Sequence, residues 1–277
     1  MHVQAKFSNN LNIFEYSIVI RKIFYLGPPG SFSQEAAEIF GSDLVPVRSI
    51  SEIFHKISVT GDYGIVPIEN SIEGPVNETL DGLFRHEDIY IVDHVEIPIE
   101  IFLASNCDTE NIRRIYSHPH AIAEAGDYLE RTENIEVIRT SSTSEAAKLA
   151  SMDEAGAALC SMKAAQHYGL ANTVKIESKS RNITRFILIG RERNVEGSRH
   201  IILCVIPDRP GSLHSLIGVL ASRGINMNMI YSRPLRDTIW KYYFYIEFSG
   251  KLDEDLLLTM GKQSLRILYK GSFKCCR

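Results

Sequence analysis

Cysteine is scarce in this 277-residue sequence, and long apolar runs are missing. The five cysteines are odd in number and none is spaced as CxxC, which argues against a disulfide framework and against a zinc site. Reduced thiols are typical of the cytoplasm, which is the compartment we expect. No stretch approaches the roughly 18 apolar residues that would span a bilayer, and the first residues do not follow the pattern of a signal peptide. We therefore expect no membrane partner.

The loops that bind nucleotides or activate nucleophiles are also missing. The glycine-rich stretch 27–30 has neither the lysine of a Walker loop nor the glycine spacing of a dinucleotide fingerprint, and no GxSxG occurs. His118 and His120 have no third ligand at metal-like spacing. The sequence therefore predicts neither a cofactor nor a metal.

Charge is nearly balanced overall but unevenly spread. The chain has 30 Lys and Arg against 34 Asp and Glu, for a net charge of −4. Residues 198–277 hold 12 of the basic residues and only 6 of the acidic ones, so the rest of the chain carries the negative excess. A basic tail can bind nucleic acid, but these basic residues are scattered and form no continuous stripe. We therefore expect no nucleic-acid partner, and a globular protein of about two domains.

A repeating order of strand, turn and helix runs through the first two thirds of the chain. Serine capping boxes that mark helix starts occur at Ser31, Ser49 and Ser142. Pro75 is expected in the first turn of a further helix. The alternation predicts an α/β fold, with a parallel sheet covered by helices on both faces. Extended segments around 90–104 and 171–185 interrupt the series and predict two lobes with a cleft between them.

Residues 198–277 follow a different order. Strand, helix, two strands, helix and strand make the βαββαβ order of ferredoxin-like domains. From Trp240 to Phe248, apolar side chains alternate with polar partners, which is the period-two pattern of a strand. We divide the chain into an N-terminal extension, a two-lobed domain, a linker and a ferredoxin-like domain, at 1–22, 23–190, 191–198 and 199–277.

Polar residues gather where the expected strands end and helices begin. Ligands of open parallel sheets bind at these carboxyl ends, and the N–H groups of helix N-termini favour carboxylates and phosphates. Helix capping explains each hydroxyl alone, but five such turns together predict a site for a small anion. The turns are 27–31, 69–71, 117–119, 142–143 and 182–186.

These turns carry motifs through which the sequence resembles the prephenate dehydratase family. The matching segments are 27–33, 66–76, 117–119 and 184–186, together with 211–213 and 232–234, which look like the two effector motifs of the family's ACT regulatory domain. The run Val-Pro-Ile-Glu-Asn-Ser and the triplet Thr-Arg-Phe are the most specific. The resemblance implies a two-lobed, periplasmic-binding-protein-like α/β catalytic domain followed by a βαββαβ ferredoxin-like ACT domain.

The activity that this resemblance implies is conversion of prephenate to phenylpyruvate, with loss of water and CO2, in phenylalanine biosynthesis. The family uses no cofactor or metal for this step. The implied partners are prephenate as substrate, phenylalanine as effector through the ACT domain, and further copies of the chain in a homodimer or homotetramer.

We assign the catalytic roles by hypothesis to Thr184, Arg185, Asn70 and Ser71. Thr184 is expected to hydrogen-bond the departing hydroxyl. Arg185 pairs either with a substrate carboxylate or with an internal acid such as Glu69, and the sequence leaves both open. The other expected substrate-binding residues are Gly27, Ser31, Ser33, Pro67, Glu69, Ser117, His118, Glu124, Thr143 and Phe186.

The effector site is expected in the ACT domain, where Gly211 lets a helix N-terminus approach an amino-acid carboxylate closely. Its other expected residues are Ser212, Leu213, Asn226, Ser232, Arg233 and Pro234. Four positions depart from the family's pattern; two of them are Ala125, where the family often has Cys, and Ser212, where it typically has Ala. Glu124 stands where the family usually has Gln, and Tyr231 stands where the second effector motif begins with Glu.

Two other functions stay open on the sequence alone. The first is a two-lobed small-anion-binding protein with an amino-acid-sensing module and no catalysis, which would not need the Thr-Arg-Phe triplet. The second is arogenate dehydratase, whose substrate carries an amino group in place of the keto group. The residues do not distinguish arogenate from prephenate.

Overall fold

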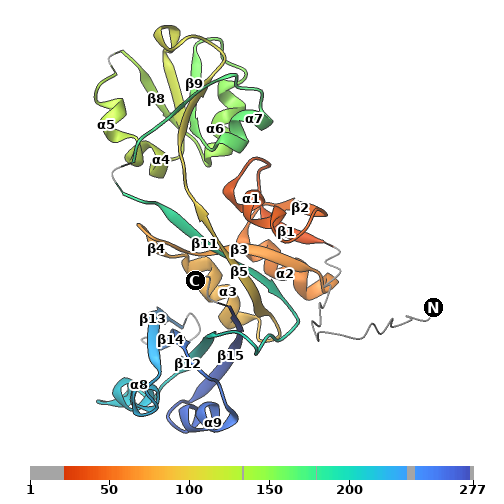
Figure 1. Ribbon diagram of the computed structural model, residues 1–277, viewed down its shortest axis with the longest axis vertical. Coiled ribbons are helices and arrows are strands. Elements are labelled where there is room, and N and C mark those ends of the chain that lie inside the picture. Colours follow the sequence, from red (N-terminus) through yellow and green to blue (C-terminus); the bar gives the residue numbers. More distant parts are fainter. Residues whose placement is uncertain (1–21, 133, 179, 236–240, 275–277) are drawn as a thin grey trace, which may run out of the picture.

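The computed structural model describes residues 22–132, 134–178, 180–235 and 241–274, and it is elongated (Figure 1). A small lobe lies at one end of the long axis, a large lobe lies in the middle, and the C-terminal domain lies at the other end. Nearly all of the extension expected at 1–22, and the strand residue Trp240, lie outside the described residues.

The large lobe joins a mixed sheet to three helices. Its helices are α1 (Phe32–Glu38), α2 (Ile50–Thr60) and α3 (Asn77–Arg85). Its strands are β1 (Ile23–Leu26), β2 (Leu44–Val47), β3 (Tyr63–Asn70), β4 (Gly74–Pro75), β5 (Tyr90–Pro98) and β11 (Ile183–Gly190). β1 runs parallel to β2 and β3, as strands connected through helices do.

The small lobe has a five-stranded sheet in the order β10-β6-β9-β7-β8. The strands are β6 (Phe102–Ser105), β7 (Arg114–Ser117), β8 (Glu136–Arg139), β9 (Gly156–Cys160) and β10 (Asn172–Lys175). The helices are α4 (Pro119–Glu124), α5 (Gly126–Leu129), α6 (Thr143–Ala150) and α7 (Met162–His167), with a 3₁₀ turn at Thr109–Asn111.

The predicted α/β class is confirmed, but both sheets are mixed and not wholly parallel. β7 runs parallel to β8 and β9, whereas β6 runs antiparallel to β9 and β10, and β11 runs antiparallel to β3 and β5. The antiparallel strands belong to the two extended segments that cross between the lobes, β5 to β6 and β10 to β11. A strand that arrives from the other lobe has no crossover helix behind it, so nothing constrains it to run parallel.

The predicted helix starts agree with the structure at three serines and differ at one proline. The hydroxyls of Ser31, Ser49 and Ser142 each accept the backbone N–H three residues ahead, as capping boxes require. Pro75 lies instead in β4, which pairs with the end of β3, and α3 begins only at Asn77. No helix among the described residues is long and apolar enough to cross a membrane.

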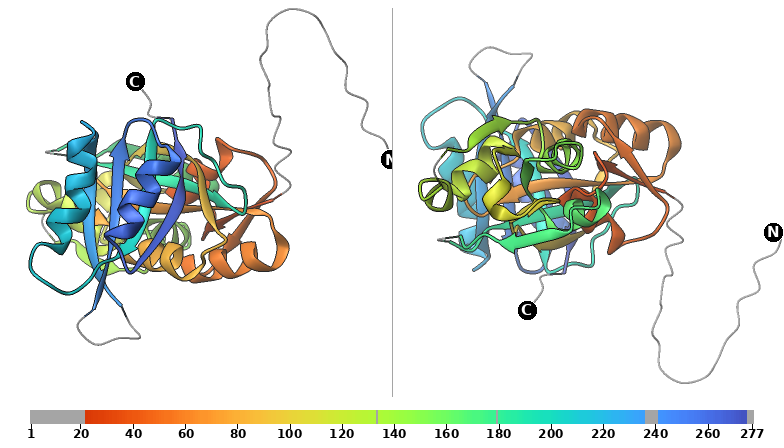
Figure 2. Two further views of the ribbon diagram at one scale, coloured as in Figure 1. Left: turned by 90° about the horizontal axis from the view of Figure 1, so that it is seen from below. Right: turned by 90° about the horizontal axis from the view of Figure 1, so that it is seen from above.

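The C-terminal domain has the expected βαββαβ order. Its elements are β12 (Arg199–Val205), α8 (Ser212–Ser222), β13 (Asn226–Pro234), β14 (Tyr242–Ser249), α9 (Glu254–Lys262) and β15 (Arg266–Phe273). The strands lie in the order β13-β14-β12-β15, and α8 and α9 cover the face that points away from the large lobe (Figure 2, left). A parallel contact between Gly271 of β15 and Ile91 of β5 continues this sheet into that of the large lobe.

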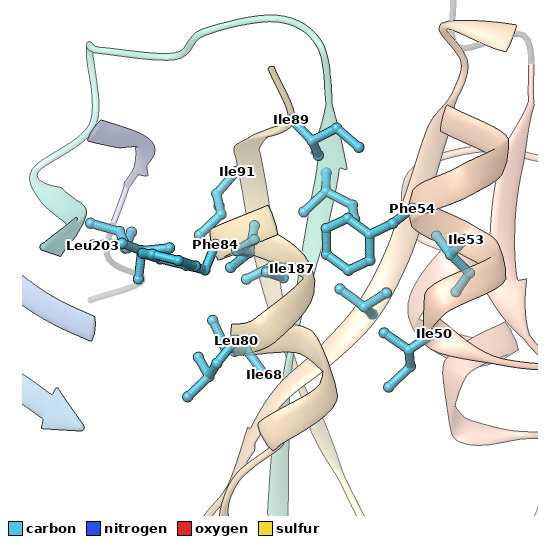
Figure 3. Close-up of a cluster of buried hydrophobic side chains, with 14 of the residues drawn as sticks. Ile50, Ile53, Phe54, Ile68, Leu80, Phe84, Ile89, Ile91, Ile187 and Leu203 are labelled. Atoms are coloured by element: carbon cyan, nitrogen blue, oxygen red, sulfur yellow. The ribbon is translucent and has the colours of Figure 1, made fainter. Parts of the chain in front are cut away.

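The inner face of the C-terminal sheet is buried as well. Ile246 and Phe248 pack under the helices, in agreement with the period-two pattern. The intervening residues were expected to be the polar partners of that pattern, yet Tyr243 and Tyr245 belong to the core of the large lobe. Figure 3 shows the contact, with Leu203 of β12 beside Phe84 of α3. The two domains therefore share one hydrophobic core.

Candidate active site

A cleft of about 640 Å³ lies between the two lobes, where strands of both sheets end. The large lobe contributes residues of α1, β3 and β11 to its wall, and the small lobe contributes the starts of α4 and α6. The lining includes Phe32, Ser33, Pro67, Asn70, Thr184 and Phe186 from the large lobe, and His118, His120, Glu124, Ser142 and Thr143 from the small lobe.

Asn70 and Thr184 lie opposite each other on β3 and β11, on the face of the sheet that forms the cleft. The Nδ2 of Asn70 donates to Thr184 Oγ1 at 2.9 Å. Its Oδ1 accepts the backbone N–H groups of Ile72 and Glu73 at 2.9 and 3.0 Å, which settles which end of the amide is the donor. Thr184 Oγ1 therefore receives a hydrogen bond, and no described residue accepts the proton of its hydroxyl.

A row of hydrogen bonds continues from this pair into the small lobe. The Nδ2 of Asn70 also donates to Asn182 Oδ1 at 2.7 Å, and Asn182 Nδ2 donates to Glu124 Oε2 of α4 at 2.9 Å. From Asn70 through Asn182, each amide donates toward the Glu124 carboxylate, while the other bond of the Asn70 amide runs to Thr184. The row links the two lobes across the cleft and holds the Asn70 amide in place.

Arg185 and Glu69 lie on the opposite face of the same two strands. Because side chains alternate along a strand, the neighbours of Thr184 and Asn70 point away from the cleft. Arg185 Nη2 binds Glu69 Oε2 at 2.7 Å. The sequence left open whether Arg185 pairs with a substrate carboxylate or with an internal acid, and in the structure it pairs with the internal acid. Burial opposes the charge of Arg185, but the carboxylates of Glu247 and Glu69 outweigh it, and its pKa is raised.

The other expected binding residues divide into two groups. Those on the cleft wall are Ser33, Pro67, His118, Glu124, Thr143 and Phe186. Those that do not line it are Gly27, Ser31, Glu69 and Ser117, together with the expected catalytic residues Ser71 and Arg185. The residues of the second group have other contacts, away from the cleft.

The hydroxyls of this second group hold backbone in place. Ser71 exchanges two hydrogen bonds with Ile183, through its N–H at 2.8 Å and its Oγ at 2.9 Å, and so holds the start of β11. Ser117 is fully buried and donates to the Leu159 carbonyl at 2.8 Å. Ser31 caps α1. These residues shape the site without facing it, because a cap or a strand end directs its hydroxyl at the chain.

The charge of the cleft wall is negative. Four carboxylates line it, and no Lys or Arg does so among the described residues; the acids are Glu73, Glu124, Asp127 and Glu177. Burial and the neighbouring His120 lower the pKa of His118, whose Nδ1 accepts the His120 N–H at 3.3 Å. Among the described residues of the wall, the groups left to bind an anion are backbone N–H groups and neutral side chains.

Asn182 is the main residue that the sequence analysis missed. It appeared there only as part of a polar turn. Its spacing of two from Thr184 and four from Phe186 places all three on one strand face, so period two was the available signal. Asp127, Glu177 and His120 gave no comparable signal, because only the folding of the small lobe brings them to the cleft.

Direct contacts join the two lobes on the side of α1. The Oγ of Ser161 donates to the Gly30 carbonyl at 3.1 Å, and the Oγ of Ser144 donates to the Pro29 carbonyl. Gly30 has φ +84°, and a Cβ there would lie 3.0 Å from Ala164 Cα. A side chain there would be strained at this φ and would press on α7, so glycine suits this close approach.

The expected effector residues also divide. Gly211 precedes α8 without a side-chain cap, and the buried Oγ of Ser212 has no hydrogen-bond partner among the described residues. Arg233 instead binds the catalytic side of the molecule, because its guanidinium makes two hydrogen bonds to Asp81 of α3 at 3.2 and 3.1 Å. Ser232 and Pro234 alternate with it and are exposed.

Comparison with known proteins agrees with the resemblance in the sequence. Residues 23–194 match the family model described as prephenate dehydratase. The chain belongs to the prephenate dehydratase family. Residues 200–259 match the ACT domain model, which makes the C-terminal unit an ACT domain.

Relatives of this prephenate dehydratase family member are similar over most of its length. The bifunctional chorismate mutase/prephenate dehydratase of Aquifex aeolicus is 37% identical over 243 residues, 84% of this chain and 67% of that protein. The prephenate dehydratase of Methanocaldococcus jannaschii is 32% identical over 271 residues, 91% of this chain and 98% of that protein. The prephenate dehydratase of Arthrobacter aurescens, solved in complex with L-Phe, is 26% identical with a TM-score of 0.82, covering 92% of this chain and 90% of that one.

Proposed function

We propose that the protein is a prephenate dehydratase whose proton donor is Thr184. The observation that carries the proposal is the Asn70–Thr184 pair on the cleft wall of a family member. Prephenate loses its ring hydroxyl and, from the opposite ring carbon, CO2. The electron pair of the breaking carbon–carboxylate bond enters the ring as the carbon–oxygen bond breaks, so a single proton for the departing hydroxyl completes the reaction and no oxidant is needed.

Thr184 is suited to donate that proton because the Asn70 amide donates a hydrogen bond to the Thr184 hydroxyl oxygen. A threonine hydroxyl is a weak acid, and a hydrogen bond donated to its oxygen stabilises the negative charge that grows there as the proton moves away. The Asn70 amide supplies this bond at 2.9 Å in a fixed orientation. The bond is present before substrate arrives, so no reorganisation is needed during the reaction.

The rest of the cleft fits a ring that carries two carboxylates. Phe186 of β11 and Phe32 of α1 contribute an apolar wall. The N-terminal turns of α1, α4 and α6 all reach the lining, at Ser33, His120 and Thr143. Backbone N–H groups in first helical turns favour carboxylates, and they offset the acidic side chains of the wall.

Replacement of Thr184 tests the catalytic proposal. We expect Thr184→Ala to lower kcat by about 10²–10³-fold, the usual cost of one transition-state hydrogen bond, and Thr184→Ser to keep most of it. The measurement is phenylpyruvate formation, with prephenate and arogenate supplied side by side. A wild-type protein that forms no product from either substrate would identify a binding protein, and an unimpaired Thr184→Ala would assign the donor elsewhere.

We further propose feedback inhibition by phenylalanine at the start of α8. The unpartnered Ser212 hydroxyl and the uncapped N-terminus of α8 offer donors for an amino-acid carboxylate. β13 is the edge strand of the sheet, so a second chain can pair with it and complete the site, which gives at least a dimer. Activity and sedimentation that both stay unchanged across a phenylalanine titration would contradict this part.

A further inference from the structure

A second polar cluster lies on the rear face of the catalytic strands, against the ACT domain. Arg185 binds Glu247 Oε2 of β14 and Glu69 Oε2 of β3, each at 2.7 Å. Glu247 also accepts from Arg199 of β12 at 2.5 Å, and Tyr231 of β13 donates to Glu69 at 3.0 Å. Five side chains from five strands of both domains thus form one network, which we call the rear cluster.

Burial makes the rear cluster rigid. The Glu247 side chain is 0% exposed and that of Arg185 is 16% exposed. Charges removed from water cost free energy unless they are paired, and breaking one pair leaves its partner buried without compensation. Glu247 has an arginine on each carboxylate oxygen, and Arg185 has a carboxylate from each domain. Neither side chain can move without losing such a pair.

The rear cluster is joined to the catalytic pair by the strands themselves. Arg185 directly follows Thr184 on β11, and Glu69 directly precedes Asn70 on β3. The register places Arg185 opposite Glu69 and Thr184 opposite Asn70. A shift of the Arg185 backbone therefore displaces the Thr184 hydroxyl as well. Catalytic groups must be held within about 0.5 Å of their productive position, so small shifts of this kind are costly.

We propose that Glu247 of the ACT domain is a positioning residue for the dehydration step, acting through Arg185 on the proton donor Thr184. The inference rests on the proposed function and deepens it, because it makes the ACT domain part of the catalytic support. The effector strand β13 reaches the same region twice, through Tyr231 to Glu69 and through Arg233 to Asp81. The Tyr231 contact belongs to the rear cluster and joins β13 to β3, and the Arg233 contact joins β13 to α3.

Glu247→Gln in the full-length chain tests the proposal, since it removes the charge and keeps the shape. We expect kcat to fall by about tenfold or more while KM changes by less than about threefold, because the donor is misplaced and the cleft wall is intact. Glu87→Gln is the matched control. It removes an exposed ion pair between the domains, Arg266 to Glu87, that touches neither catalytic strand, and we expect it to leave kcat unchanged.

A double-mutant cycle separates positioning from loss of general stability. If Glu247 acts through Thr184, then Glu247→Gln has little further effect once Thr184→Ala is present, less than about twofold in kcat. An equal loss of kcat in both backgrounds would overturn the proposal. Tyr231→Phe removes only a hydroxyl from the rear cluster and supplies a second variant if Glu247→Gln does not fold, with an expected severalfold loss of kcat that also vanishes in the Thr184→Ala background.

The two proposals fail in different ways. Absence of product with the wild-type chain overturns the dehydratase function itself. An active wild type in which Glu247→Gln and Tyr231→Phe both match Glu87→Gln overturns only the positioning role of the ACT domain.

Discussion

Asn70 is the residue on which most of the site depends. Its oxygen is held by two backbone N–H groups, and its nitrogen serves Thr184 and Asn182 together. All the hydrogen-bonding capacity of the amide nitrogen is thus used within the cleft wall. No other amino acid of this size has both an acceptor and a two-proton donor.

The change Asn70→Asp removes both of these donated hydrogen bonds without changing the size of the side chain. A carboxylate accepts only, so it faces the oxygens of Thr184 and Asn182 with no proton to offer. We expect kcat to fall by about 10²–10³-fold. Steady-state kinetics with prephenate measures this, and kcat within about threefold of the wild type would show that Asn70 does not support the donor.

The glycine-rich loop between β1 and α1 is the element that sets the distance between the lobes. We expect Gly30→Ala to raise KM, because its Cβ would press on Ala164 of α7 and move the small lobe outward. The alanine also costs about 1–2 kcal/mol of unfolding free energy at a positive φ. Gly61→Ala is the control, since Gly61 has φ +72° with no atom within 4 Å of its Cβ position. The Gly61→Ala variant should lose a similar amount of stability and keep the KM of the wild type. Equal KM values for Gly30→Ala and Gly61→Ala would contradict the role of the loop.

In the small lobe, β7 is anchored by an ion pair whose contribution depends on pH. Asp153 binds Arg114 at 2.5 and 2.6 Å and accepts from Tyr116 at 2.9 Å, and its hydrogen bonds with Arg114 hold the pKa of the carboxyl well below its usual range. A carboxyl with a lowered folded pKa stabilises the fold above its unfolded pKa of about 3.9, and that contribution is lost as pH falls through the folded value.

We therefore expect Asp153→Asn to lower the free energy of unfolding by about 1–3 kcal/mol at pH 7. The difference from the wild type should shrink as the pH falls below about 4. Urea denaturation across pH 7 to pH 3 measures it, with the exposed neighbour changed by Glu154→Gln as the control. A difference that stays constant over this range would exclude the ion pair as its source.

At the scale of the whole molecule, charge opposes the binding of substrate. The lobes carry the negative excess of the chain, four carboxylates line the cleft, and prephenate is a dianion. Salt shortens the range of repulsion from about 30 Å at 0.01 M to about 8 Å at 0.15 M. We expect kcat/KM to rise severalfold over that range while kcat at saturation stays nearly constant. A fall in kcat/KM with salt would mean that the net field attracts the substrate.

The shared core joins the two domains along a continuous apolar contact. The ACT sheet is covered by helices on its outer face and by the large lobe on its inner face, and the rings of Phe84 and Tyr243 stack at 4.2 Å across the boundary. Gly271 permits the closest approach, since a Cβ there would lie 2.2 Å from the Ile91 carbonyl oxygen. The linker is therefore only one of several connections between the catalytic and regulatory parts.

The sequence by itself determined the local features of this protein. Capping boxes, period-two strands and the βαββαβ order are set by neighbouring residues. They were therefore readable in the sequence, and they predicted the α/β class and the helix starts at Ser31, Ser49 and Ser142. The motifs of the family are likewise short segments of sequence. The Thr-Arg-Phe triplet also indicated Thr184 as a site residue, although the sequence placed it in a turn and the structure has it in β11. In each case the deciding interactions join residues only a few positions apart.

Only the tertiary structure decided which partner each of these side chains has. Arg185 pairs with Glu247, 62 residues away, because the inner face of the ACT sheet is buried against the large lobe. Ser71 and Ser117 turned out to bind backbone, and Asn182 joined the site, since strand register and the packing of two lobes direct these groups. A periodic pattern tells which residues share a face, but the charge and shape of the surface opposite that face depend on distant parts of the chain.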